Sequence, residues 1–168
     1  MYYVQGTETH TTTKEEEIAK DLRAELDETS ENKSRVHRKL DLEINGRLVS
    51  FIHHGPARGR GANEGDPMRN WLKMVYWSYK KRELRIPDMI VTGHLHTHFY
   101  NTYVQDFSVL HGLIVPSWQR KTRYAWRFAP MDVNDIGMVA FEITAGGEIK
   151  MPVPMVMPDR RGTKTVKI

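Results

Sequence analysis

The sequence predicts an α/β domain in which mixed β-sheets are flanked by helices. Three observations support this class. Two stretches repeat apolar residues at the 3.6-residue spacing of amphipathic helices. Another stretch alternates apolar and polar residues on both sides of Asn45-Gly46, which is typical of a β-hairpin. Residues 88–93 are short and almost entirely apolar, as in strands that are buried on both faces.

The N-terminal part predicts a strand followed by a helix. Residues 2–5 have the composition of a strand. A helix is predicted over residues 13–28, because Thr13 and Glu16 form a capping box and three acids lie in the first turn, where the helix dipole favours them. We expect the buried face of this helix to carry three apolar residues: Ile18, Leu22 and Leu26.

The middle of the chain predicts a hairpin, a loop, a helix and a buried strand. The hairpin covers residues 35–54, and a Gly-rich irregular segment follows it. A second helix is predicted over residues 68–84, and the strand over residues 88–93 comes after it. We expect one face of this helix to carry Leu72, Val75 and Tyr79, with Trp71 close by.

The C-terminal part predicts further strands and a basic tail. Residues 103–117 and 136–155 are rich in strand-forming residues, and Gly146-Gly147 is placed to turn the last hairpin. The tail, residues 159–168, is expected to be frayed. Because we find no repeats and no linker, residues 1–168 are predicted to form a single domain.

Composition sets limits on the function. The chain has 168 residues, is 39% hydrophobic and 27% charged, and is therefore typical of a soluble domain with a sizeable core. The formal net charge of +4 permits an anionic ligand such as a phosphate ester or nucleic acid. There is no cysteine, which excludes disulfides and thiolate metal sites. Since no apolar run approaches the roughly 18 residues of a membrane span and no signal-peptide pattern is present, we expect a cytoplasmic protein without a membrane anchor.

Three predicted strands run into loops that carry histidine. These loops are "GTETH" at residues 6–10, "HHGP" at residues 53–56 and "TGHLHTH" at residues 92–98. In layered α/β folds, ligands bind beyond the carboxyl ends of strands, so the three loops are expected to converge. Imidazole is the commonest metal-binding side chain. A single histidine after a strand is more often a surface or capping residue, but a His-x-His pair and a second strand-terminal pair favour a metal role.

Two other histidines, His37 and His111, lie in strand-like stretches, and we interpret both as structural or surface residues.

These segments, taken in order, resemble the C-terminal part of the calcineurin-like metallophosphoesterases. The motifs of that family end with Gly-Asn-His-Asp/Glu, then a lone His after a strand, then Gly-His-x-His. The sequence "GHLH" at residues 93–96 matches the last motif, and "FIHHGP" at residues 51–56 matches the lone His. "GTETH" takes the place of the Gly-Asn-His motif but departs from it, because Thr7 or Glu8 stands where Asn is expected and His10 is shifted by two residues. The resemblance extends from residue 1 to about residue 150.

The resemblance implies a two-metal phosphoesterase site and roles for particular residues. It implies three ligands to one ion: His53 (with His54 as the alternative), His94 and Glu8. It assigns His96 to the second ion, and it makes His10 the histidine that protonates the leaving oxygen or stabilises the transition state. Divalent manganese, iron or zinc would suit this mixture of imidazole and carboxylate, with two ions in the complete family site and one expected here.

The first two motifs of the family, Asp-x-His and Gly-Asp-x-x-Asp, are not found before "GTETH". They supply the aspartate that bridges the two ions. We therefore expect this chain to correspond to the C-terminal portion of the fold. The missing motifs would come from a companion chain or from a longer natural protein. The alternative is a catalytically incomplete protein that survives as a nucleic-acid-binding module or a scaffold. A partial fold should expose apolar sheet surface and an open edge, so association with a companion chain or with itself is expected.

The nucleic-acid alternative depends on basic residues interleaved with aromatic ones. Basic side chains could contact phosphates, while aromatic rings stack on bases. The residues concerned are Arg58, Arg60, Arg120, Lys121, Arg123 and Arg127, with Trp118, Tyr124 and Trp126. For any single run, a solvated basic face over apolar anchors is the favoured interpretation, and a basic rim beside a metal centre would also suit a nuclease.

Overall fold

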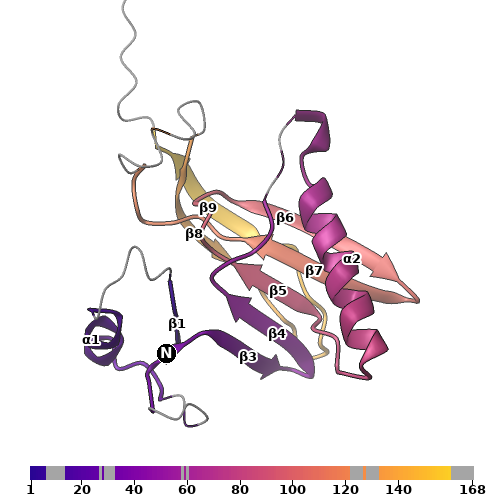
Figure 1. Cartoon of the computed structure of the whole chain (residues 1–168), viewed down its shortest axis with the longest axis horizontal. Coiled ribbons are helices and arrows are strands. Elements are labelled where there is room, and N and C mark those ends of the chain that lie inside the picture. The colour runs from indigo at the N-terminus through magenta and orange to yellow at the C-terminus, as the bar shows by residue number, and fades with distance from the viewer. Residues whose placement is uncertain are drawn as a thin grey trace, which may run out of the picture.

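The computed structural model describes residues 1–6, 14–26, 28, 33–57, 59, 61–121, 127 and 133–159. At its centre lies a five-stranded sheet with the order β3-β4-β5-β7-β6 (Figure 1). Strands β4, β5 and β7 are parallel, whereas β3 and β6 pair antiparallel at the two edges. The strands are β3 (Lys39–Ile44), β4 (Arg47–Ile52), β5 (Met89–Thr92), β6 (Phe99–Gln105) and β7 (Ser108–Ile114). The prediction of an α/β fold with mixed sheets is confirmed.

The predicted hairpin is formed by β3 and β4. Asn45 and Gly46 connect the two strands with φ values of 48° and 79°. These values are those of a type I′ turn, whose twist matches that of the flanking strands. The turn therefore determines the register in which Ile44 pairs with Arg47 and Lys39 pairs with Ile52.

One face of the sheet is covered by helix α2 (Asp66–Lys81). The helix begins two residues before the predicted start and ends three residues before the predicted end. Strand β5 is buried along its whole length, as predicted. Gly112 in β7 permits the close approach of the helix, since a Cβ there would lie 2.7 Å from Sδ of Met68. The core on this side consists of Met68, Leu72, Tyr76, Ile90, Leu110 and Ile114.

The opposite face of the sheet is covered by the C-terminal segment. Strands β8 (Asp135–Ala140) and β9 (Val153–Pro158) form an antiparallel pair, and Gly146-Gly147 lies in the turn between them, as predicted. Buried residues of the sheet pack against apolar residues of this segment. The buried residues are Val49, Met89, Val91 and Leu113, and their partners include Val139, Phe141, Ile143 and Ile149.

Strand β9 is exposed along its whole length, and its outer edge carries two prolines. The N–H of Asp159 donates to the carbonyl of Asn134 at 2.8 Å, so the odd-numbered residues of β9 direct their polar backbone groups toward β8. Pro154 and Pro158 therefore occupy positions whose N–H would point away from β8. Proline at such positions is a known protection of edge strands.

The N-terminal segment forms a small separate sheet. Strands β1 (Tyr3–Val4) and β2 (Val36–His37) pair in parallel, and helix α1 (Lys14–Asp21) packs beside β2. Glu15 accepts a hydrogen bond from the N–H of Gly6 at 2.8 Å, and Glu16 accepts one from the N–H of Arg35 at 3.0 Å. The first-turn acids of α1 thus hold the chain on both sides of the helix. His37 is buried, which agrees with a structural role.

The prediction that Ile18, Leu22 and Leu26 form the buried face of α1 is wrong. Its three apolar residues are exposed, whereas Ala19 and Ala24 are buried. The exposed fractions are 44% for Ile18, 46% for Leu22 and 42% for Leu26. The helix has eight residues and ends at Asp21, and two-residue strands offer too little apolar surface to cover a long stripe.

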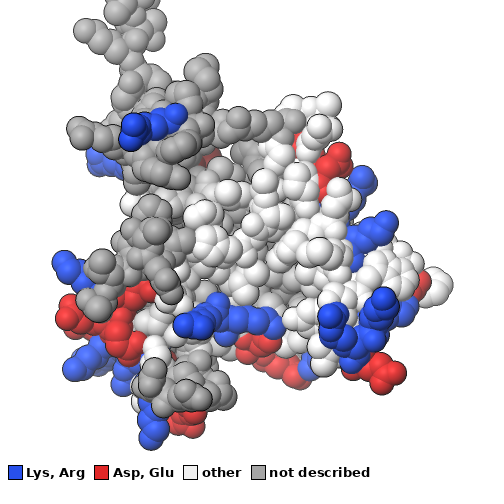
Figure 2. Space-filling model, viewed as in Figure 1, with Lys and Arg blue, Asp and Glu red and all other residues white. Residues whose placement is uncertain are grey.

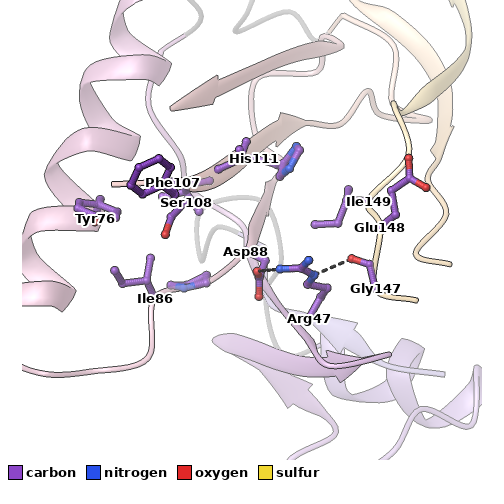
Figure 3. Close-up of a pocket in the computed structure, with 13 residues that line it drawn as sticks. Arg47, Tyr76, Ile86, Asp88, Phe107, Ser108, His111, Gly147, Glu148 and Ile149 are labelled. Atoms are coloured by element: carbon purple, nitrogen blue, oxygen red, sulfur yellow. Dashed lines mark hydrogen bonds and ion pairs between the residues drawn. The ribbon is translucent and has the colours of Figure 1, made fainter. Parts of the chain in front are cut away.

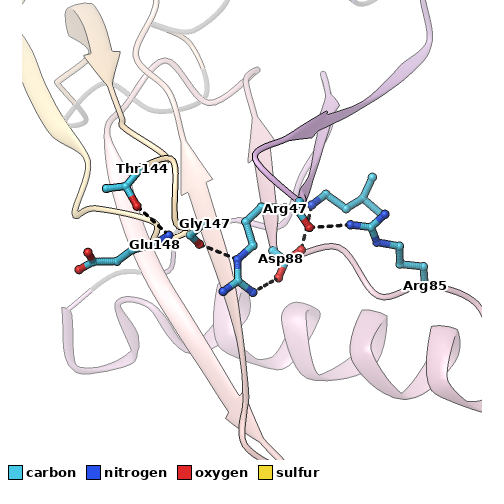
Figure 4. A network of polar contacts seen from close by, with 8 residues as sticks. Arg47, Arg85, Asp88, Thr144, Gly147 and Glu148 are labelled. Carbon is cyan, nitrogen blue, oxygen red and sulfur yellow. Dashed lines mark hydrogen bonds and ion pairs between the residues drawn. The ribbon is translucent and has the colours of Figure 1, made fainter.

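A polar network joins three segments at the amino end of β5 (Figure 4). The guanidinium of Arg47 donates to Asp88 at 2.9 Å and to the carbonyl of Gly147 at 2.6 Å. The other carboxylate oxygen of Asp88 accepts the N–H of Leu48 at 2.8 Å. Arg85 donates to the carbonyl of Gly46 at 2.8 Å. These contacts connect the β3–β4 turn, the start of β5 and the turn between β8 and β9.

No helix within the described residues is long and apolar enough to cross a membrane.

Candidate metal centre

The loops after β4 and β5 meet because these strands are parallel neighbours. Ile52 of β4 pairs with Thr92 of β5, so the residues that follow the two strands, His53 and Gly93, leave the sheet at the same level. The N–H of Gly93 donates to the carbonyl of His53 at 3.1 Å and continues the ladder by one bond. The convergence expected for two of the three histidine loops is therefore present at the carboxyl edge of the sheet.

Three histidines gather at this edge. His53, His54 and His94 each offer a ring nitrogen, and these three atoms lie within 4.8 Å of one another. Nδ1 of His94 lies 3.2 Å from Nε2 of His53. The ring centroids of His54 and His94 are 4.3 Å apart, and those of His53 and His54 are 4.8 Å apart. Both members of the "HH" pair thus join the cluster, where the sequence had left the choice between them open.

The turn that carries His53 and His54 depends on Gly55. A Cβ at this position would lie 2.6 Å from Oγ1 of Thr92, which is 1% exposed. A side chain there would force the turn away from β5. At Gly93 the corresponding Cβ would meet only ordinary contacts, with Nδ1 of His53 at 3.6 Å. Gly55 is therefore the glycine that the histidine cluster requires for its close packing.

The loop after β5 holds its histidines in strained backbone conformations. The N–H of Leu95 donates to the carbonyl of Gly93 at 2.9 Å, closing a three-residue turn around His94, whose φ is 69°. His96 also has a positive φ, 53°. Leu95, between them, packs against the core beneath α2. Strain of this kind persists only where the surroundings impose it and is frequent at functional sites.

The spacing of the cluster fits a metal ion. Two nitrogens that bind tetrahedral zinc at about 2.0–2.1 Å lie about 3.3 Å apart. The observed separation of 3.2 Å between His53 and His94 agrees with this value. Three imidazoles and an open fourth position are also the donor set of a catalytic zinc site. This group of histidines could therefore hold one ion. Within the described residues it includes no carboxylate.

The fourth histidine, His96, lies beside the start of β8. Its Nδ1 is 3.4 Å from Nδ2 of Asn134, and its carbonyl accepts the N–H of Asp135 at 2.8 Å. It is not part of the cluster formed by His53, His54 and His94. The sequence had not pointed to Asn134, because no local pattern distinguishes it.

His98 follows on the same loop. Its N–H donates to Oδ2 of Asp135 at 2.7 Å, and its buried Nε2 has no hydrogen-bond partner within the described part of the chain. Burial lowers the pKa of the His98 imidazole, while the nearby Asp135 carboxylate raises it to a smaller extent. A neutral ring is therefore favoured at this position.

Two of the site residues implied by the resemblance, Glu8 and His10, lie outside the described residues. The same is true of Arg58, Arg60, Arg123, Tyr124 and Trp126 in the suggested nucleic-acid surface. Of the remainder of that surface, Trp118 is 68% exposed and Arg120 and Arg127 are exposed. On the face shown in Figure 2, blue and red residues are interspersed around the lower edge, and the centre is mostly uncharged.

A separate cavity of about 390 Å³ lies at the other end of the strands (Figure 3). Its lining includes Arg47, Asp88, Ser108 and His111, which are at or near the amino ends of β4, β5 and β7. Nδ1 of His111 lies 2.6 Å from the hydroxyl of Tyr100. The histidine cluster stands at the carboxyl ends, so this cavity is not part of the metal centre.

The fold and the cluster together define an α/β protein with three histidines at the carboxyl ends of adjacent parallel strands. No family model and no curated protein matches the chain. Among solved structures, Vps29 of Entamoeba histolytica, complexed with zinc, is similar with 15% identity and a TM-score of 0.40. The similarity covers 70% of this chain and 61% of Vps29.

The protein TM1076 of Thermotoga maritima, solved by NMR, is similar with 17% identity and a TM-score of 0.30, over 72% of this chain and 52% of that one. The chain thus spans less than two thirds of either structure. With these TM-scores, neither likeness identifies a family or an activity.

Proposed function

We propose that the loops after β4 and β5 form a divalent metal centre used in the hydrolysis of phosphate esters. The observation that carries the proposal is the meeting of three histidine ring nitrogens within 4.8 Å. The ligands proposed from the described residues are His53, His54 and His94. Zinc, manganese and iron are the candidate ions, since all three accept imidazole ligands.

In this proposal the three histidines bind the ion, and the ion contacts the substrate. His53 and His94, which follow adjacent strands, would hold the ion together with His54. A bound divalent ion would supply Lewis acidity toward a phosphate oxygen. The exposed positions of His54 and His94 leave this edge open to a substrate. The net charge of +4 favours the approach of anions, including nucleic acid, so a nuclease activity belongs to the same proposal.

Catalysis would also require groups that the described residues do not bring to the cluster. A carboxylate ligand and a proton donor are implied by the resemblance, and Glu8 and His10 are the candidates within this chain. Among the described residues no aspartate belongs to the cluster, so we propose that a bridging aspartate comes from another chain or from further sequence. We therefore propose that full activity depends on such complementation, by a companion chain or by a second copy.

The second candidate function is that of a catalytically incomplete binding protein, a scaffold or nucleic-acid-binding module derived from the same fold. The specific observation in its favour is the lack of a carboxylate in the cluster within the described residues. In this case the ion would stabilise the two loops and would not activate water.

Metal binding and hydrolysis are tested separately. Isothermal titration of metal-free protein with zinc and manganese gives stoichiometry and affinity. Hydrolysis is then measured with p-nitrophenyl phosphate and bis-p-nitrophenyl phosphate. Binding of zinc with loss in the His53→Gln variant supports the centre, and hydrolysis that depends on the metal supports the enzyme. Binding without hydrolysis favours the second candidate. If no ion binds at micromolar concentration, the proposed function is wrong.

A further inference from the structure

The outward face of the β8–β9 pair is apolar throughout. Val139 packs against the core of the central sheet, so the residues that alternate with it along the two strands point away from that sheet. These residues are Ile136, Met138, Ala140, Val153, Met155 and Met157. Three of them, Val153, Met155 and Met157, are between 50% and 62% exposed. We call this set the ribbon face, and a contiguous apolar patch of this kind is typical of an interaction site.

The free edge of β9 does not favour the addition of another strand. Pro154 and Pro158 lack the N–H groups that a neighbouring strand would need on this side. A partner must therefore pack on the ribbon face itself, as helix α2 packs on the central sheet. Its own surface must be apolar, because the ribbon face offers no charged or hydrogen-bonding side chain.

The chain itself has a helix with an uncovered apolar side. Ile18 and Leu22 are one turn apart on α1, and the N–H of Leu22 donates to the carbonyl of Ile18 at 2.9 Å. They are 44% and 46% exposed, whereas the neighbouring Ala19 is buried. We call this pair the helix face. Since the helix face and the ribbon face are both exposed, they do not cover each other within one molecule.

We propose that the helix face of one molecule packs on the ribbon face of a second copy, and that the reciprocal contact closes a two-fold dimer. Two-fold dimers are the commonest oligomers, and a reciprocal contact leaves neither face open for further growth. The histidine cluster belongs to neither face, so this inference does not rest on the proposed function.

The dimensions of the two elements agree with this packing. Helix α1 has eight residues and is therefore about 12 Å long. Strands β8 and β9 have six residues each and are about 20 Å long. The whole helix can thus lie on the ribbon face.

Charge favours a contact between helix and ribbon over a contact between two helices. Residues 14–28, which include α1, contain seven acidic and three basic residues. Residues 117–168, which include β8 and β9, contain five acidic and nine basic residues. Opposite net charges draw the N-terminal segment of one molecule toward the C-terminal segment of another, whereas two N-terminal segments repel each other.

Sedimentation velocity of the full chain, with and without a chelator, tests the dimer. We expect twice the monomer mass of 19.6 kDa as the concentration rises from micromolar to near-millimolar. Leu22→Glu and Met155→Glu each place a charge on one face and should raise the Kd of the dimer by more than about tenfold. Leu84→Glu and Met74→Glu are the matched controls, because these side chains are 52% and 60% exposed but belong to neither face. Both controls should remain dimeric.

An equimolar mixture of Leu22→Glu and Met155→Glu tests the pairing itself. Each variant keeps one intact face, so one of the two contacts can still form between unlike molecules. With a fluorescent label on one variant, we expect a heterodimer at concentrations where each variant alone is monomeric. Formation of the heterodimer also shows that both variants are folded.

Several outcomes would overturn the inference. They are a monomeric wild type, a dimer that persists in both variants, and equal dissociation in the two controls. A mixture that stays monomeric would exclude the pairing of α1 with β8 and β9. A dimer that forms only with added zinc would reflect bridging through histidines and would overturn the inference as well. If zinc does not bind but the dimer behaves as expected, only the proposed function fails.

Discussion

Nε2 of His53 lies 3.2 Å from Nδ1 of His94, although 41 residues separate them in the sequence. The contact follows from the parallel pairing of β4 with β5, which places the two strand ends at the same level. A pair of imidazoles at this distance either shares a proton in a hydrogen bond or shares a metal ion.

Replacing any one of the three clustered histidines with glutamine should weaken zinc binding. Loss of a hydrogen bond that orients a metal ligand typically lowers metal affinity roughly 10–100-fold. Loss of the ligand itself should therefore lower zinc affinity by more than about 100-fold. The measurement is a competition titration of zinc against a chromophoric chelator, for His53→Gln, His54→Gln and His94→Gln.

His111→Gln is the matched control, because His111 lies in β7, at the other end of the strands. It should bind zinc as the wild type does. Equal weakening in His111→Gln would show that the loss reflects general destabilisation and would remove support for the cluster. Affinity in the wild type should also fall as the pH is lowered, since imidazoles bind metals only when deprotonated.

Gly55→Ala should disturb the metal centre more than Gly93→Ala. The added methyl group at residue 55 would meet buried Thr92 at 2.6 Å, whereas at residue 93 it would make a normal contact at 3.6 Å. We expect zinc affinity to fall roughly 10–100-fold in Gly55→Ala, as it does when a group that orients a metal ligand is removed. The opposite order in the same titration would contradict the described packing of the 53–55 turn.

The backbone at residue 94 should be more stable with glycine than with alanine. His94 has a φ of 69°, a conformation that glycine adopts without a steric penalty. Both His94→Gly and His94→Ala remove the imidazole, so a comparison between them isolates the backbone. We expect His94→Gly to be more stable by about 1 kcal/mol in urea unfolding, the lower range for a strained residue. Equal stabilities would indicate that the turn relaxes when the ring is absent.

Mild acid should destabilise the wild type through His111. Burial lowers the pKa of its imidazole below the ordinary value of 6.5, Arg47 lowers it further, and Asp88 raises it. Above pH 6.5 the ring is neutral in both folded and unfolded chains. As the pH falls below 6.5, the unfolded chain binds a proton first, and stability is lost until the folded pKa is reached. Unfolding free energies between pH 8 and 5 should therefore decline less in His111→Gln, and parallel profiles would contradict this.

Asp106 should stabilise the turn between β6 and β7 at neutral pH. Hydrogen bonds from Lys80, Gln105 and Tyr76 lower the pKa of its carboxyl from 3.8 to about 2. Because this folded pKa is depressed, the contribution is present above pH 3.8 and is lost as the pH falls to about 2. Asp106→Asn should be less stable than the wild type at pH 7, and the difference should disappear near pH 2. A difference that persists at pH 2 would point to packing and not to charge.

Elements with strong local signals were predictable from the sequence. The Asn45-Gly46 turn requires positive φ at both residues, and the apolar run of β5 requires burial on both faces. The stripe of Ile18, Leu22 and Leu26 was not a reliable guide, because the surface that faces a helix is set by its neighbours.

The candidate site was predictable only in part. His-x-His after a buried strand pointed to a metal role for His94, and the parallel pairing of strands explains why His53 joins it. Whether His54 also turned toward the cluster depends on the fit of Gly55 against Thr92, which no local pattern reports. The contact between His96 and Asn134 joins residues 38 positions apart and depends on where β8 begins.

The two prolines of β9 also constrain how molecules of this protein can meet. An approaching strand would find only one backbone donor, at Val156, between Pro154 and Pro158 on the outer edge. Growth of a continuous hydrogen-bonded sheet from one molecule to the next is blocked at this edge. Contacts here must instead be made by side chains, such as the exposed Met155 and Met157, whose unbranched thioethers adapt to surfaces of different shape. Such contacts favour reversible, finite complexes over fibrils.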